Sequence, residues 1–266
     1  MSHTVSTQAA QTAISPQKAA WTPARRALVI AGAVLIAATW LYFVLVHPAD
    51  WDQVTGSGPG IALLAGYGIG TALLLAAVIP VLPARTLGLI PIAIIINSVV
   101  GEIVGSIGLP LYLDSVGTVL VAALAGPVAG MATGALNNVV WGLLNPAALP
   151  FAAGAALVGW LAGVFIHRFN AFRNILTVIG FGIVLGIVGG MVAAPVAAYV
   201  YGGTAGVGTG ALVSLFREMG GSLIASVTTQ AFISDPVDKV IVMLVSYFTV
   251  KALPKRTVSA FAPQAK

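Results

Sequence analysis

Long apolar segments recur along this chain of 266 residues, and they restrict its possible folds more than any other feature. Hydrophobic residues make up 59% of the chain and charged residues only 7%, a balance that soluble globular domains do not show. A helix needs about 20 apolar residues to cross a bilayer, and segments of that length recur between short polar stretches. Ten-residue stretches of alternating polarity, typical of membrane β-barrels, are missing. The sequence therefore predicts an all-α integral membrane protein.

Breaks at Gly, Pro and charged residues divide the chain into eight expected membrane helices. Their predicted ranges are 27–46, 60–82, 87–107, 116–124, 128–144, 149–166, 175–200 and about 235–251. The last helix is expected to begin at Asp235 and Pro236, since an Asp before a Pro is typical of a helix N-terminus. We thus expect a disordered cytoplasmic tail (1–24), two N-terminal transmembrane helices (25–84), a six-helix core (85–256) and a cytoplasmic tail (257–266).

Basic residues predict the orientation of these helices, because the cytoplasmic loops of membrane proteins are rich in Lys and Arg. Their positions place both termini in the cytoplasm and the chain in the plasma membrane as a multi-pass protein. The apolar segment 211–232 does not fit a further crossing, because it contains Arg217 and Glu218 and would leave the basic C-terminal end outside. We therefore expect residues 201–234 to form an outer or re-entrant element, broken at a Gly-Gly pair. A layout of nine helices is the alternative.

Composition also argues against several classes of function. The chain has no cysteine, and its three His are far apart, so the sequence predicts neither a thiol site nor a metal site. No catalytic constellation is present, and we expect no enzyme activity. The net charge of +5 comes from Lys and Arg at helix ends and does not indicate nucleic-acid binding. No polar stretch is long enough for an ATPase domain, so any energy source would be another chain.

Glycines repeat at every fourth residue from Gly126 to Gly134 and again from Gly182 to Gly190. Rows of small residues let two helices approach closely in lipid. One interpretation is packing within the chain, and the other is a docking face for a partner subunit.

Polar residues gather around the outer end of the helix predicted at 87–107. Asn97 and Glu102 lie inside that helix, and Tyr112 and Asp114 follow it in a short loop. A carboxylate in a membrane-length segment is costly unless it is paired or hydrated, so it marks a candidate functional site. We predict that these four residues bind a small molecule.

Two structural explanations compete with this prediction. Glu102 would pair with Arg217 or Lys239, which are the few cations expected near the outer half of the membrane. Asp114 would cap the following helix, with help from Ser115.

A second polar group lies at one end of the helix predicted at 128–144. Asn138, Trp141 and Asn145 follow helical spacing and share one face, which Asn137 flanks. Amides donate and accept hydrogen bonds without carrying charge, and an indole offers a stacking surface for a flat ring. We predict that this face is the wall of a pocket open to the outside. The alternative is hydrogen bonding between helices together with an interfacial Trp.

Four segments, LPLYLDSVGTVLVAALAGPVAG, NPAALPF, SDPVDKVI and KALPKR, occur in this order between residues 109 and 256. In this respect the chain resembles the S components of energy-coupling factor (ECF) transporters, in particular the group with an LYLDS-type loop after the first core helix. The resemblance implies a six-helix membrane protein that captures a vitamin or similar solute from outside. It also implies partners, namely a transmembrane coupling subunit and two ATPase subunits that use ATP, and no cofactor in this chain.

The chain departs from this family in two respects. The Ala-x-x-x-Ala motif by which the first core helix often contacts the coupling subunit is absent from residues 87–107, and two N-terminal helices are added. The residue types of the site suit a flat, polar heterocycle, neutral or cationic, such as a vitamin, a pyrimidine or a nucleoside, and do not choose among these. A membrane sensor that binds such a ligand without moving it is the second hypothesis. A secondary transporter is the third, although the two related halves typical of such carriers are not found.

Overall fold

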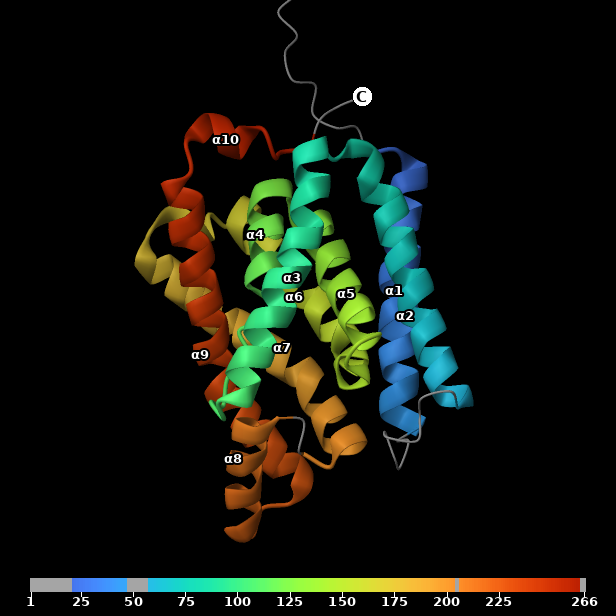
Figure 1. Ribbon diagram of the computed structural model, residues 1–266, viewed down its shortest axis with the longest axis vertical. Coiled ribbons are helices and arrows are strands. Elements are labelled where there is room, and N and C mark those ends of the chain that lie inside the picture. Colours follow the sequence, from blue (N-terminus) through green and yellow to red (C-terminus); the bar gives the residue numbers. More distant parts are fainter. Residues whose placement is uncertain (1–20, 47–56, 204–205, 264–266) are drawn as a thin grey trace, which may run out of the picture.

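Helices account for all the regular structure in a computed structural model that describes residues 21–46, 57–203 and 206–263 (Figure 1). The helices are α1 (Pro23–Val46), α2 (Gly58–Val78), α3 (Ala84–Ser106), α4 (Val116–Ala125), α5 (Pro127–Gly142), α6 (Ala152–Arg168), α7 (Ile175–Tyr201), α8 (Val207–Glu218), α9 (Leu223–Ala252) and α10 (Lys255–Ser259). Short 3₁₀ helices occur at η2 (Ile79–Val81), η3 (Pro146–Phe151) and η4 (Ala171–Arg173). The predicted disordered tail, residues 1–24, falls almost entirely outside the described residues.

Five helical segments of the described chain are long and apolar enough to cross a membrane. They are α1, α2 with η2, α3, η3 with α6, and α7. The prediction of an all-α membrane protein is therefore confirmed. Helix α9 is longer than any of these, with 30 residues, but it carries Asp235, Asp238 and Lys239 near its middle. Asp235 and Lys239 line the cavity at the candidate site.

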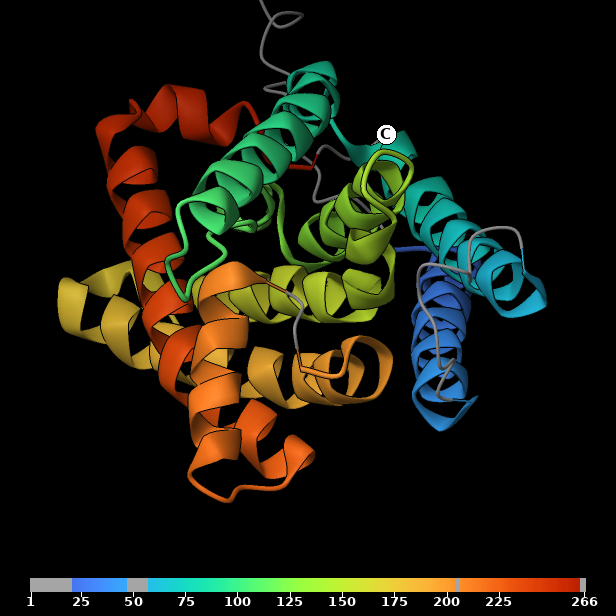
Figure 2. The same ribbon diagram turned by 60° about the horizontal axis from the view of Figure 1, so that its bottom comes forward.

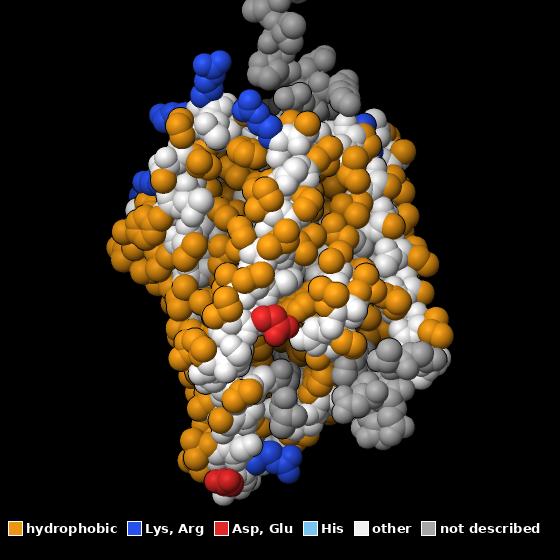
Figure 3. Space-filling model, viewed as in Figure 1, with side chains coloured by type: hydrophobic (Ala, Val, Ile, Leu, Met, Phe, Trp, Pro, Cys, Tyr) orange, Lys and Arg blue, Asp and Glu red, His pale blue; other side chains and the backbone are white. Residues whose placement is uncertain are grey.

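Most helices run along the long axis of the molecule, and α1 begins at the same end at which α9 finishes (Figure 1). Helix α8 and the turn into α9 lie at the opposite end (Figures 1 and 2). Lys and Arg side chains gather at the α10 end, and hydrophobic side chains cover most of the face between the two ends (Figure 3). This arrangement is typical of a helical bundle in a bilayer with one basic face.

The glycine rows lie where helices of the same chain touch. A Cβ added at Gly134 would come within 2.1 Å of the Ala155 carbonyl oxygen on α6, and one added at Gly186 within 2.4 Å of Cα of Pro236 on α9. Only glycine lets these backbones approach so closely. The rows therefore form the α5–α6 and α7–α9 contacts, in agreement with the interpretation that they pack within the chain.

The two N-terminal helices pack together at one side of the bundle (Figures 1 and 2) and are tied to the core by hydrogen bonds. Trp40 on α1 donates through Nε1 to the Val192 carbonyl on α7 over 3.1 Å. Tyr67 on α2, which is fully buried, donates through its hydroxyl to the Pro150 carbonyl of η3 over 3.3 Å. Helix α2 thus supports η3, which borders the candidate site.

The prediction that the last helix begins at Asp235 is wrong. Helix α9 begins twelve residues earlier, after Ser222, whose side chain accepts a hydrogen bond from the Ala225 N–H. Pro236 lies inside the helix, where it removes one backbone donor, a loss that transmembrane helices tolerate when neighbouring helices pack closely. Gly186 on α7 provides that close packing.

The segment expected as an outer or re-entrant element, residues 201–234, divides into α8 and the first part of α9. The break occurs at Gly220 and Gly221, as predicted, and Gly220 has a φ of 93° that favours glycine. Arg217 and Glu218 lie at the end of α8 and so next to this turn, away from the middle of the bundle.

The segment expected to be a cytoplasmic tail, residues 257–266, is described as far as residue 263, and this part contacts the bundle. Thr86, buried at the start of α3, donates through its hydroxyl to the Phe261 carbonyl over 2.7 Å. The chain therefore returns to the first core helix after α10.

Candidate functional site

A cavity of about 410 Å³ lies among α3, α5, α6, α7 and α9, and the start of α8 also borders it. Its polar lining comes from helices and loops that are far apart in the sequence. Six of the eight predicted site residues line it, namely Glu102, Tyr112, Asp114, Asn138, Trp141 and Asn145. Small residues from α6 and α7 form much of the opposite wall, among them Gly154, Ala155, Gly189 and Ala193. The structure thus brings the two predicted polar groups to one space.

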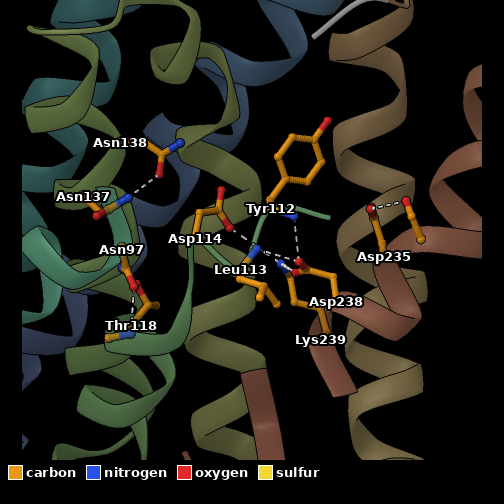
Figure 4. Close-up of polar contacts among 12 residues, drawn as sticks. Asn97, Tyr112, Leu113, Asp114, Thr118, Asn137, Asn138, Asp235, Asp238 and Lys239 are labelled. Atoms are coloured by element: carbon orange, nitrogen blue, oxygen red, sulfur yellow. Dashed lines mark hydrogen bonds and ion pairs between the residues drawn. The ribbon is translucent and has the colours of Figure 1, made fainter. Parts of the chain in front are cut away.

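The other two predicted residues, Asn97 and Asn137, do not line the cavity. Asn97 is fully buried between α3 and α4, where it donates to the Thr118 hydroxyl over 2.9 Å and accepts from the Gly117 N–H over 2.7 Å (Figure 4). Asn137 donates to Oδ1 of Asn138 over 3.1 Å, and Asn138 donates to the Ala148 carbonyl over 2.8 Å. Asn97 therefore joins helices, and Asn137 orients its neighbour.

Glu102 connects α3 to α5 at the cavity. Its Oε1 accepts hydrogen bonds from Nε1 of Trp141 and from Nδ2 of Asn145, each over 3.0 Å. The competing explanation, an ion pair of Glu102 with Arg217 or Lys239, is wrong among the described residues, because Glu102 accepts from donors on α5 and next to it, and Lys239 pairs with Asp114 and Asp238. Gly101 leaves room for the indole, since a Cβ there would lie 2.9 Å from Cη2 of Trp141.

The loop between α3 and α4 is held by a carboxylate from α9. Asp238, which is fully buried, accepts through Oδ1 from the backbone N–H groups of Tyr112 over 2.9 Å and Leu113 over 2.7 Å (Figure 4). Leu113 has a φ of 50°, a conformation that costs energy in a residue with a side chain. The two hydrogen bonds offset that cost and fix the loop beside the cavity.

Lys239 lies on α9, and its side chain reaches the loop. Its Nζ is hydrogen-bonded to Asp238 and lies 3.7 Å from Oδ1 of Asp114 (Figure 4). Asp114 therefore pairs with Lys239, and the competing explanation that it caps α4 is wrong, because Ser115 is the N-cap residue. Ser115 is the residue before α4, and its side chain makes no capping hydrogen bond.

Tyr112 links the loop to α8 at the edge of the cavity. Its hydroxyl lies 3.0 Å from the Thr209 hydroxyl, and Gly206 and Val207 at the start of α8 also line the cavity. This hydrogen bond between side chains joins the two segments that cover this side of the cavity.

Asp235 and Gln230 on α9 also line the cavity, and the sequence did not identify them as site residues. Asp235 is predicted to cap the start of the last helix, and Gln230 is not among the predicted site residues. Asp235, Asp238 and Lys239 follow helical spacing within a long apolar segment, a pattern that indicates one polar face on a membrane helix. That pattern could have identified them, but the Pro after Asp235 favoured a helix start instead.

Among the described residues, no group of three His, Asp or Glu side chains is placed to hold a metal ion. The lining combines many small apolar residues with a few carboxylates, amides and aromatic rings, and such a surface can contact an organic molecule. Comparison with protein-family models, curated proteins and solved structures gives no match, and the function must be argued from this cavity.

Proposed function

We propose that this chain is the substrate-binding subunit of an ECF-type importer, which captures a vitamin or related small heterocyclic solute from outside for uptake driven by ATP. The observation that carries the proposal is the cavity of about 410 Å³ lined by carboxylates, amides and aromatic rings. Ligand sites in proteins have volumes of roughly 300–1,000 Å³ and combine apolar walls with a few placed polar groups. A pyrimidine, a nucleoside or a vitamin ring fits these limits.

Two aromatic side chains support recognition of a flat ring. The indole of Trp141 is held in place by its hydrogen bond to Glu102 and by its packing against Gly101. The ring of Phe151 stacks on Tyr201, with centroids 5.7 Å apart and an angle of 8° between the planes. Aromatic rings that are fixed before the ligand arrives lose little entropy on binding.

We propose that the solute enters the cavity from the α8 end of the molecule. The loop that carries Tyr112 and the start of α8 cover the cavity there, and the Tyr112–Thr209 hydrogen bond joins them. With the basic α10 end in the cytoplasm, by the positive-inside tendency, this entrance faces outside and both termini are cytoplasmic. The protein would then be a multi-pass component of the plasma membrane.

We propose that partner chains supply the energy for uptake. All the described elements belong to the helical bundle, and within residues 21–46, 57–203 and 206–263 no separate nucleotide-binding domain is present. A transmembrane coupling subunit and two ATPases would supply the missing function. In this proposal, helices α3, α4, α5, α6, α7 and α9 would be the six core helices of such a subunit.

The test begins with a thermal-shift screen of the purified chain against vitamins, pyrimidines and nucleosides, because a bound ligand raises apparent stability. The radiolabelled hit is then given to proteoliposomes that contain the chain alone, or the chain with a coupling subunit and two ATPases. We expect binding in both preparations and ATP-dependent accumulation only in the second. Accumulation against a gradient by the chain alone would instead indicate a secondary transporter. Binding without accumulation in either preparation would indicate a sensor.

A further inference from the structure

The cavity carries more negative than positive charge. Glu102, Asp114 and Asp235 line it, whereas Lys239 is the cationic residue among the described lining residues. Lys239 is already bound by Asp114 and by Asp238, which lies behind the cavity wall. The ammonium group is therefore shared by two carboxylates at ion-pair distance, and its one positive charge is set against the four carboxylates of Glu102, Asp114, Asp235 and Asp238.

Asp235 has the greatest remaining capacity to bind a ligand. The hydrogen bond that the structure gives its carboxylate is a long one, 3.4 Å from the Ser234 hydroxyl, and no described Lys, Arg or His forms an ion pair with it. An ionised carboxylate can accept several hydrogen bonds. A Cβ at Gly190 would lie 2.9 Å from Oδ2 of Asp235, so the α7 backbone rests against this carboxylate and limits its rotamers.

Two further groups at the cavity have hydrogen-bonding capacity in reserve. Ser115 is only 6% exposed and lines the cavity, yet its hydroxyl has no hydrogen-bond partner among the described residues. Both hydrogen bonds to Glu102 go to Oε1, which leaves Oε2 available. A buried hydroxyl without a partner is costly unless a ligand or water satisfies it. This observation is independent of the charge balance and also indicates a bound polar molecule.

We infer that the solute bound here is a small, flat organic cation, such as a ring that carries an amidinium or a protonated amine. Its N–H groups would donate to Asp235, its ring would lie against Trp141, and Glu102 would contribute the second negative charge. The inference rests on the proposed function, since it names the chemical class of the solute. A carboxylate in a site of low dielectric attracts a cation strongly and excludes an anion of the same shape.

Benzamidine, benzamide and benzoate test this inference, because they have similar shapes and are cationic, neutral and anionic. Calorimetric titration of the full-length protein in nanodiscs should show benzamidine binding at least about tenfold more tightly than benzamide, with no binding of benzoate. Asp235→Asn should lower the affinity for benzamidine by roughly 10- to 100-fold and change the affinity for benzamide little. The matched control is Glu218→Gln, an exposed carboxylate on α8 away from the cavity, which should change neither affinity.

If Asp235→Asn does not fold, Glu102→Gln provides a second variant, because Glu102 is exposed and should tolerate the change. Equal affinities for benzamidine and benzamide, or no binding of benzamidine, would overturn the inference that the solute is a cation. So would a benzamidine preference that neither variant reduces. Equal binding of both probes that is lost in Trp141→Ala would overturn the inference of a cationic solute. It would still support the cavity as the binding site. The importer proposal itself is decided separately by the accumulation experiment.

Discussion

Nε1 of Trp141 donates to Oε1 of Glu102 over 3.0 Å, and this hydrogen bond joins α5 to α3 at the cavity. The two residues are 39 positions apart in the sequence, and each was predicted as part of the site for a different reason. Their contact means that a carboxylate orients the indole and that Asn145 shares the same acceptor. A change at Glu102 therefore affects both charge and ring position.

Glu102→Gln separates these two effects. The amide oxygen can still accept from Trp141 and Asn145, and Glu102 is exposed, so we expect the free energy of unfolding to change by less than about 0.5 kcal/mol. Affinity for the solute should fall, because the negative charge is lost. Chemical denaturation and calorimetric titration measure the two quantities. A loss of several kcal/mol in stability with unchanged affinity would show that Glu102 has a structural role only.

Asp238→Ala tests the attachment of the loop to α9. The change leaves two backbone N–H groups and Lys239 without their buried partner, so we expect a loss of about 3–5 kcal/mol in the free energy of unfolding. Denaturation of the detergent-purified protein gives the value, and Glu218→Gln serves as the exposed control. A variant as stable as the wild type would mean that Asp238 does not anchor the loop.

Gly134→Ala tests the close contact between α5 and α6. The added methyl would meet the Ala155 carbonyl oxygen at 2.1 Å, so we expect destabilisation by about 1–3 kcal/mol. Gly180→Ala on α7 is the matched control, because no atom lies within 4 Å of its added Cβ. The higher helix propensity of Ala should make that variant neutral or slightly more stable. Equal thermal stabilities for the two variants would contradict the packing described here.

Single cysteines test the orientation, since the native chain has none. Ser214 on α8 and Ser259 on α10 are both exposed and lie at opposite ends of the molecule (Figure 1). An impermeant maleimide should label Ser214→Cys in intact cells and Ser259→Cys only after the membrane is opened. The reverse pattern would place the cavity entrance in the cytoplasm.

Much of the helix order follows from the sequence, because lipid requires long apolar helices and Gly or Pro marks their ends. The turn at Gly126, with a φ of 95°, and the break at Gly220 are examples. The polar face of Asn138, Trp141 and Asn145 was also visible, because helical spacing alone places these residues together.

Contacts between distant segments could not be predicted in the same way. Asp238 binds Tyr112 across 126 residues of sequence, and no local pattern indicates which loop a carboxylate on α9 will meet. The sequence predicts Asp235 at a helix start, and this is wrong because an Asp-Pro pair has the same local signature at a helix start and inside a helix. Which of the two applies depends on packing against α7, where Gly186 admits Pro236.

Titration of the solute found by the screen into Trp141→Ala and Asn138→Ala tests most directly whether this cavity is the binding site. Stacking of a base on an aromatic ring is worth about 1–3 kcal/mol, so Trp141→Ala should weaken binding by roughly 5- to 150-fold. Asn138→Ala should have a similar effect, because a polar group of the solute loses its partner. Wild-type affinity in both variants would place the solute elsewhere in the protein.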